Sequence, residues 1–189
     1  MNQKRTDEEI RREKMERRAK ERKEIRGWII PYVTVVIFAC GLLLCFRIVN
    51  VEGKSMSDTY KNGDVVIVNH IGYLLGNKQV NRGAVVVVGA TENLPRAIIK
   101  RVIAVGGDVI NIDFTSGAVM VNDEVLKEEY ITEPTTIDEG AHEYPVVVPE
   151  GCYFVLGDNR NHSIDSRSPL VGFVAADDII GEVICKLPF

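Results

Sequence analysis

Twenty consecutive residues near the start of the chain, Gly27–Phe46, carry no charge. As an α-helix they would measure about 30 Å, the thickness of the hydrocarbon core of a bilayer. Trp28 and Tyr32 lie near one end, where aromatic rings favour the membrane interface, and Pro31 is expected in the first turn. The run is too long for a cleaved signal peptide, and no small-x-small site follows it. The pattern therefore predicts a transmembrane helix over residues 27–47.

From residue 48 the pattern changes to short runs rich in Val and Ile, separated by Gly, Asn, Asp and Pro. Such runs are typical of β-strands, and the residues between them are typical of turns. Asn122-Asp123 between two runs predicts a hairpin. Segment 130–145 is polar and is predicted to be an excursion from the sheets or a flap. The predicted strands are Val65–Val68, Ala84–Val88, Ala97–Val105, Val109–Ile112, Ala118–Val121, Val146–Val148, Tyr153–Leu156 and Glu182–Cys185.

The fold class is therefore mainly β, with an N-terminal transmembrane α-helix followed by a β domain of antiparallel sheets over residues 48–189. Residues 1–26 hold eleven Lys or Arg against seven Asp or Glu, a net charge of +4, whereas the whole chain carries −4. They are predicted to form a solvated, charged tail that is helical. A basic tail stays in the cytoplasm, so the β domain is expected outside a single-pass cytoplasmic membrane protein. The β domain has no basic cluster that could follow a phosphate backbone, which excludes nucleic acid as a partner.

The cysteines and histidines form no pattern with the spacing of metal ligands, and neither a metal nor a cofactor is expected. Two cysteines lie in the apolar run and two in separate predicted strands. The latter pair is either two buried thiols or, in an extracellular domain, a disulfide. The residues are Cys40, Cys45, Cys152, Cys185, His70, His142 and His162.

Ser55 is a candidate nucleophile, because it follows a flexible Gly53 just after the apolar run. A serine hydroxyl needs a base, and no Ser-His-Asp set stands out. A lysine can serve as the base if desolvation makes its amine neutral. Lys100 is the lysine inside an apolar predicted strand, and its neighbour Arg101 must point to the opposite face. Lys100 could equally be an edge-strand charge that discourages aggregation.

A third segment, Gly157–Arg167, follows a predicted strand and is dense in Asp, Arg, Ser and Asn. Arg–carboxylate pairs in such a segment can fix a loop rigidly, and a hydroxyl can orient a lysine amine. A loop network with no chemical role is the alternative interpretation.

Together these segments resemble the bacterial type I signal peptidases of the Gram-positive type, which remove signal peptides from exported preproteins. The resemblance covers about residues 28–187. It rests on Gly53-Lys54-Ser55-Met56, Gly63-Asp64-Val65-Val66, Lys100-Arg101-Val102 through Gly106-Gly107-Asp108, and Gly157–Arg167, in this order.

The resemblance implies that Ser55 attacks the scissile carbonyl and that Lys100 is the general base. Ser163 would hydrogen-bond the lysine amine, while Asp158, Arg160, Asp165 and Arg167 would hold the loop. Val51, Met56 and Ile99 would line the pocket for the residue before the cut. Val49, Val66 and Ile99 would line the pocket two residues further back. The implied partners are signal peptides with a small-x-small motif, bound as an added β-strand, and the phospholipid membrane.

The sequence departs from the family beside the nucleophile. The family usually has Pro and then Thr-Leu after Ser-Met, where this chain has Asp58, Thr59 and Tyr60. Gly53 also stands where some members have a serine that helps to stabilise the oxyanion. These departures leave open a non-catalytic or altered-specificity membrane relative that binds exported peptides. A self-cleaving Ser–Lys protease similar to the SOS repressors is the other alternative.

Overall fold

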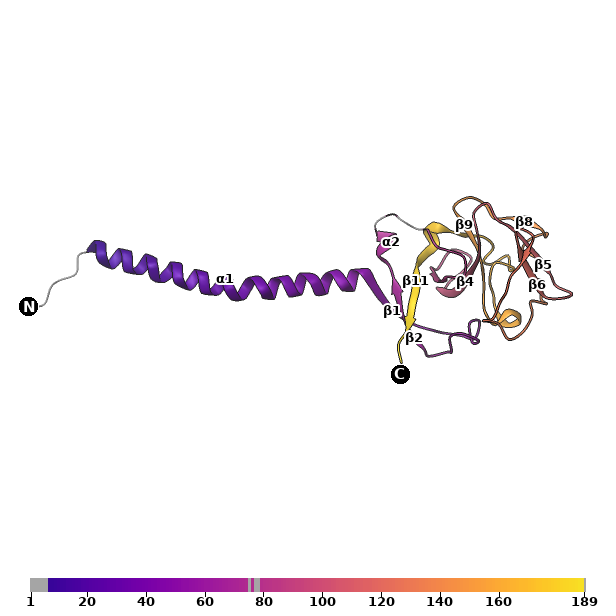
Figure 1. Ribbon diagram of the computed structural model, residues 1–189, viewed down its shortest axis with the longest axis horizontal. Coiled ribbons are helices and arrows are strands. Elements are labelled where there is room, and N and C mark those ends of the chain that lie inside the picture. The colour runs from indigo at the N-terminus through magenta and orange to yellow at the C-terminus, as the bar shows by residue number, and fades with distance from the viewer. Residues whose placement is uncertain (1–6, 75, 77–78, 189) are drawn as a thin grey trace, which may run out of the picture. The chain divides into compact units, whose positions relative to one another are not determined.

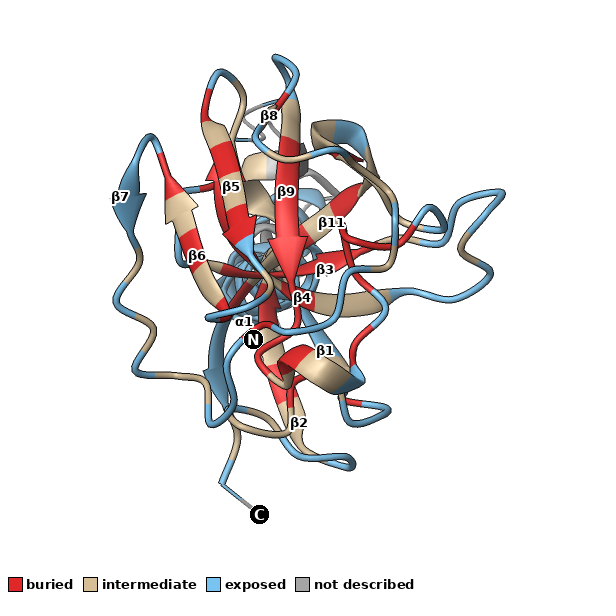
Figure 2. Cartoon of the chain, turned by 90° about the vertical axis from the view of Figure 1, so that its right-hand side faces the viewer, coloured by how far each residue is buried: buried red, intermediate tan, exposed pale blue. Residues whose placement is uncertain are grey.

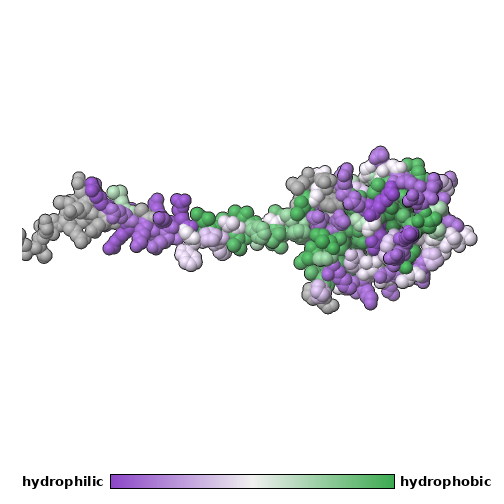
Figure 3. Space-filling view, in the orientation of Figure 1, coloured by the Kyte–Doolittle hydropathy of each residue, from purple (hydrophilic) through white to green (hydrophobic). Residues whose placement is uncertain are grey.

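The computed structural model describes residues 7–74, 76 and 79–188. The chain divides into two units, Met1–Leu43 and Leu44–Phe189. Helix α1 (Asp7–Cys45) is the one helix among the described residues that is long and apolar enough to cross a membrane. Its side chains change from hydrophilic to hydrophobic along its length (Figure 3). Residues 7–26 are helical, and residues 1–6 of the predicted tail lie outside the described residues.

Pro31 was predicted in the first turn of a helix, and this prediction is wrong. Pro31 lies inside α1. The charged residues before it continue the same helix, so the apolar run has no separate N-terminal turn. Pro31 removes one intrahelical hydrogen bond. At its other end α1 stops at Cys45, and Phe46 and Arg47 of the predicted 27–47 helix belong to a strand.

The second unit contains two antiparallel sheets (Figure 1). The seven-stranded sheet has the order β1-β2-β11-β3-β4-β9-β10, and the four-stranded sheet has the order β7-β6-β5-β8. Within the described ranges of this unit, the connections contain the short helices α2 (Ile71–Leu74), η1 (Arg160–His162) and η2 (Ala176–Asp178). The strands are β1 (Phe46–Asn50), β2 (Val65–Asn69), β3 (Val85–Val88), β4 (Ile98–Val105), β5 (Val109–Asp113), β6 (Ala118–Val121), β7 (Glu124–Val125), β8 (Val146–Val147), β9 (Cys152–Leu156), β10 (Val174–Ala175) and β11 (Ile179–Lys186).

All eight predicted strands are confirmed. Their ends shift by at most one residue, except that β11 begins at Ile179 and not at the predicted Glu182. The predicted hairpin is also confirmed: Val121 pairs with Glu124, and Asn122 and Asp123 form the turn, both with positive φ. Three strands were not predicted. Strand β1 directly continues the apolar run, while β7 and β10 have only two residues each and so carry no alternating pattern.

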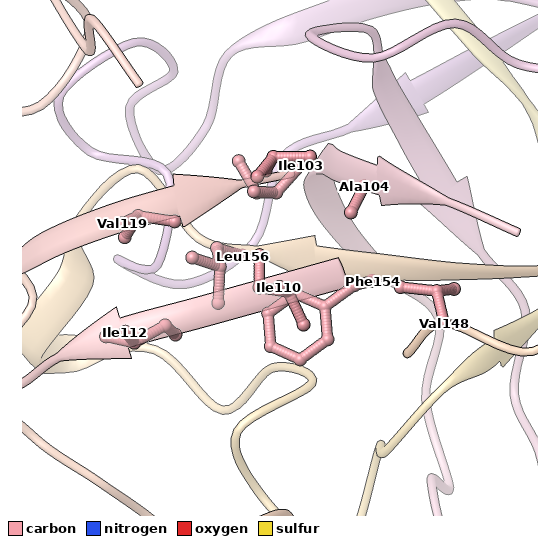
Figure 4. Close-up of a cluster of buried hydrophobic side chains, with 9 residues drawn as sticks. Ile103, Ala104, Ile110, Ile112, Val119, Val148, Phe154 and Leu156 are labelled. Carbon is pink, nitrogen blue, oxygen red and sulfur yellow. The ribbon is translucent and has the colours of Figure 1, made fainter. Parts of the chain in front are cut away.

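The hydrophobic core consists of three clusters of buried side chains. Strand β3 is buried along its whole length (Figure 2). Val86 and Val88 join one cluster, and Val85 and Val87 join another. A third cluster connects the two sheets (Figure 4): Ile103, Ala104, Ile110, Ile112, Val119, Val121, Val148, Phe154 and Leu156. The active-site candidates therefore lie beside strands whose side chains are buried.

All four cysteines are free thiols. The disulfide between Cys152 and Cys185 that the sequence left open is therefore not formed. Cys152 is half-buried and Cys185 is exposed, so neither is the buried thiol that was the other interpretation. The polar segment 130–145 contains neither helix nor strand.

Candidate active site

Ser55 lies on a loop that buried side chains fix on both sides. Val51 and Met56 are 3% and 2% exposed and belong to the core cluster that includes Val66 and Val68 of β2. The Val51 N–H donates to the carbonyl of Asp64 at 2.8 Å. The loop bends at Gly53, whose φ of +92° is a conformation that favours glycine. Hydrophobic packing thus presents the half-buried Ser55 at the surface of the core.

Lys100 extends from β4 to the nucleophile candidate. Its Nζ lies 2.7 Å from Ser55 Oγ and 3.0 Å from the carbonyl oxygen of Ile99. The side chain is 2% exposed, and the register of β3 and β4 puts it opposite the fully buried Val86. Ser55 and Lys100, which are 45 residues apart, therefore form a hydrogen-bonded pair in an apolar environment.

Burial lowers the pKa of Lys100 to about 8, because an apolar environment disfavours the ammonium form. The carboxylates of Asp165 and Asp158 oppose this shift, and desolvation outweighs them. A lysine with this pKa is partly neutral near neutral pH. A neutral amine 2.7 Å from a serine hydroxyl can take its proton.

Cleavage is expected to rise with pH through this pKa. Lys100 is protonated and inactive below about pH 8 and neutral above it. The value of kcat/KM should therefore fall roughly tenfold per pH unit below the pKa and level off above it. The measurement is kcat/KM of the full chain in detergent with a peptide that has no titrating group near the cut. A flat profile between about pH 6 and 10 would contradict a lysine base.

Gly157 lets the third segment approach the nucleophile loop. A Cβ at this position would lie 2.2 Å from Ser163 Oγ and 2.5 Å from the Ser55 carbonyl oxygen, so no side chain fits there. The Gly157 N–H donates to Asp165 Oδ2 at 3.0 Å. Asp165 in turn accepts two bonds from the Arg167 guanidinium, both at 2.9 Å, and both side chains are fully buried. The predicted Arg–carboxylate pair is therefore present under the site.

Ser163 does not make the hydrogen bond that the resemblance implies. Its hydroxyl is buried, and among the described residues it has no hydrogen-bond partner. The Lys100 amine bonds Ser55 and the Ile99 carbonyl instead. The structure brings Ser163 beside Gly157 without joining it to the amine.

Asp158 and Arg160 both hold the loop, but each pairs with a residue that the sequence did not indicate. Asp158 accepts two bonds from Arg101, at 2.6 and 2.8 Å. Arg160 pairs with Glu128, with a shortest contact of 2.5 Å. These partners are 57 and 32 residues away along the chain. The alternation of side chains along a strand predicted that Arg101 and Lys100 point to opposite faces. No pattern in the sequence predicted that Arg101 pairs with Asp158.

Asn159 was also missed, although it lies within the third segment. Its backbone N–H donates to the Ser55 carbonyl at 3.0 Å. Its side-chain Nδ2 donates to the Lys54 carbonyl and to Ser57 Oγ, both at 2.9 Å. One residue thus fixes the backbone on both sides of the nucleophile.

Within the described part of the chain, one cavity is lined by Ser55 and a second shares Glu52, Ala97 and Ile99 with it. The smaller has a volume of about 50 Å³ and is lined by Val51, Glu52, Gly53, Ser55, Met56, Ala97, Ile98, Ile99 and Lys100. The larger has a volume of about 350 Å³ and is lined by Val49, Asn50, Glu52, Val87, Arg96, Ala97 and Ile99. Val66 lines neither of them; it is fully buried in the core below the loop. The other predicted pocket residues lie at these cavities.

Comparison with known proteins identifies the family of the chain. A family profile described as "Signal peptidase, peptidase S26" matches residues 22–187. A probable signal peptidase I-2 of Synechocystis sp. is 35% identical over 160 residues, which is 82% of this chain and 69% of that protein. Signal peptidase IB of Staphylococcus aureus is 33% identical over 178 residues, which is 86% of this chain and 88% of that protein.

A crystal structure of a signal peptidase I from Enterococcus faecalis V583 is 26% identical, with a TM-score of 0.46, and the match covers 57% of this chain and 97% of that one. The extent of the family match and the sequence identity to the curated relatives decide the assignment. The chain belongs to the signal peptidase family, peptidase S26.

Proposed function

We propose that this chain removes N-terminal signal peptides from exported preproteins as a membrane-anchored serine endopeptidase. Ser55 is the nucleophile and Lys100 is the general base. The observation that carries the proposal is the 2.7 Å contact between Lys100 Nζ and Ser55 Oγ. The burial that lowers the lysine pKa and the family match both support it.

In this mechanism the neutral Lys100 amine takes the Oγ proton while Oγ bonds to the carbonyl carbon of the scissile peptide. The backbone N–H of Ser55 donates to the oxyanion, a contribution typically worth about 3 kcal/mol. The C–N bond then breaks, and Lys100 returns the proton to the leaving amine of the mature protein. Water attacks the carbonyl carbon of the remaining ester while Lys100 takes its proton. The bond to Ser55 Oγ then breaks, and Lys100 returns the proton to Oγ.

The cavities support a small side chain in the position before the cut and a less restricted one two residues further back. The cavity of about 50 Å³ touches Ser55 and has room for about one methyl group, which suits alanine in the position before the cut. The cavity of about 350 Å³ takes the residue two positions further back. Its lining is partly apolar, through Val49 and Ile99, and carries charge at Glu52 and Arg96. This arrangement tolerates a larger residue there than in the first cavity.

The charge distribution supports a single-pass topology with residues 1–26 in the cytoplasm. Their net charge of +4 stands on one side of the apolar part of α1, and the positive-inside rule retains such a segment. The unit Leu44–Phe189 then faces the outer side of the membrane, where signal peptides emerge.

Oriented vesicles test the function and the topology together. Right-side-out vesicles containing the chain should cleave an added preprotein directly, whereas inverted vesicles should do so only after detergent. The cut should map to the bond after a small-x-small motif. Vesicles containing the Ser55→Ala variant are the matched control and should be inactive.

Three results would overturn parts of the proposal. Cleavage by intact inverted vesicles would reverse the topology. Cleavage of only the chain itself would support a self-cleaving protease. A preprotein that binds but is never cut would support a non-catalytic relative.

A further inference from the structure

Asp58 lies three residues after the nucleophile, and its carboxylate points to a distant part of the chain. Asp58 Oδ2 accepts a bond from the Thr132 backbone N–H at 2.8 Å and another from the Thr132 hydroxyl at 2.9 Å. The two residues are 74 positions apart. One carboxylate oxygen therefore joins the Ser55 loop to the irregular segment between β7 and β8.

The far side of this segment is fastened to the Gly157–Arg167 loop. Thr135 is fully buried and accepts a bond from the Arg160 guanidinium at 2.8 Å. Asn161 Oδ1 accepts from the Thr136 N–H and hydroxyl, at 3.2 and 3.1 Å. Arg160 also pairs with Glu128. The segment thus has a fixed position that does not depend on Asp58, and it can act as a support.

A second contact lies two residues before Thr132. The Arg101 guanidinium carbon lies 4.0 Å from the centre of the Tyr130 ring, a cation–π contact. Arg101 is paired with Asp158, which also accepts a 2.5 Å bond from the Thr59 hydroxyl. Tyr130 is therefore linked through Arg101 and Asp158 to Thr59, the residue after Asp58.

These contacts close a ring of hydrogen-bonded segments around the site. The Ser55 loop is joined to segment 128–136 by Asp58, segment 128–136 to η1 by Arg160 and Asn161, and the adjoining Asn159 back to the Ser55 loop. Breaking the Asp58 link opens this ring on its outer side, although Asn159 and Thr59 still join the Ser55 loop to the Gly157–Arg167 loop. Because positioning of a nucleophile contributes directly to rate, this link should matter for the chemical step.

We propose that Asp58 is a positioning residue that fixes the Ser55 loop to segment 128–136 through Thr132, and that it is not a charge that selects the substrate. The inference rests on the proposed function, because its main effect is on cleavage. Both donors of Thr132 are directed at the same carboxylate oxygen, so the residue acts as a hydrogen-bond acceptor. An uncharged acceptor of the same shape can replace it.

The test compares Asp58→Ala with Asp58→Asn in the full chain, in detergent, with a preprotein substrate. Asp58→Ala should lower kcat about tenfold with little change in KM, because two net hydrogen bonds are lost from the positioning of the loop. Asp58→Asn keeps an acceptor and should remain within about twofold of wild type. Thr132→Val keeps the backbone donor and should fall between the two. Glu124→Ala, which removes an exposed carboxylate on β7, is the control for loss of charge.

Hydrogen exchange supplies a readout that does not depend on cleavage. The Thr132 amide should exchange faster in Asp58→Ala than in wild type, and Asp58→Asn should restore its protection. Equal losses of kcat in Asp58→Ala and Asp58→Asn would overturn the inference in favour of a charge effect. A rise in KM at constant kcat would overturn it in favour of substrate binding, and a fall in melting temperature at constant kcat would make the link merely structural.

The failure of the proposed function has a different signature. A wild-type chain that cleaves no preprotein would overturn the function, while exchange at Thr132 would still show whether Asp58 holds the segment. A wild-type chain that is active and an Asp58→Ala variant with unchanged kcat and unchanged exchange would overturn the inference alone.

Discussion

Replacing Lys100 by methionine should lower kcat by about 10³-fold or more, because the variant has no group that can take the Ser55 proton. The amine lies 2.7 Å from Oγ, and among the described residues no other basic side chain hydrogen-bonds to Ser55 Oγ. The measurement is single-turnover cleavage of a preprotein by the full chain in detergent. Ser55→Ala should be as inactive, and the double variant should be no worse than either single one, because the two groups act as a unit.

Stability separates this loss from a folding defect. The pKa of Lys100 is lowered to about 8 from an ordinary value of 10.5, so burial opposes its protonated form. The folded state therefore gains stability as pH rises from about 8 toward 10.5, and at pH 7 it carries the cost of a buried ammonium. Methionine has a similar shape and no charge, so Lys100→Met should melt no lower than wild type. Lys61→Met, an exposed lysine, is the matched control. Near wild-type turnover in Lys100→Met would contradict the assigned base.

Asp165→Ala is expected to destabilise the unit Leu44–Phe189 by about 3–5 kcal/mol, the usual cost of leaving one member of a buried ion pair without its partner. Asp165 and Arg167 are both fully buried, and two hydrogen bonds of 2.9 Å join them. The change also removes the acceptor of the Gly157 N–H. Arg167 would retain its hydrogen bonds to the carbonyl oxygens of Ile137 and Arg160. These carbonyls are uncharged, so they do not neutralise the positive charge of the guanidinium.

The measurement is denaturant unfolding of the full chain in detergent, followed by far-ultraviolet circular dichroism. The double variant Asp165→Ala/Arg167→Met should recover part of the loss, because it buries no unpaired charge. Asp123→Asn, at the exposed turn of the β6–β7 hairpin, is the control and should stay within about 0.5 kcal/mol of wild type. A loss below about 1 kcal/mol in Asp165→Ala would show that the pair does not hold the loop.

The order of apolar and polar residues within short segments predicted the features that depend only on residues close together in the sequence. The strands followed from runs of Val and Ile, and the hairpin from Asn122-Asp123, because each needs only its own few residues. Lys100 could be selected as a base because its apolar strand already implied desolvation. The structure then gave the partner distance, 2.7 Å to Ser55.

Side-chain pairing between distant segments could not be predicted in the same way. Arg101 pairs with Asp158, and Arg160 with Glu128, because the two sheets bring β4, the 126–145 segment and η1 together. Asp58 was identified from the sequence only as a departure from the family beside the nucleophile, and its two bonds to Thr132 depend on the same folding of distant segments. The sequence pattern does not show which side chains of distant segments will lie opposite each other.

The place of β11 in the large sheet has a consequence for the timing of activity during synthesis. This strand, at the end of the chain, pairs with β2 on one side and with β3 on the other. Until it is made, β1 and β2, which support the Ser55 loop, have no sheet connection to β3 and β4, which carry Lys100. Pairings between such distant segments form late in folding. A growing chain should therefore remain without proteolytic activity until β11 has been synthesised and inserted.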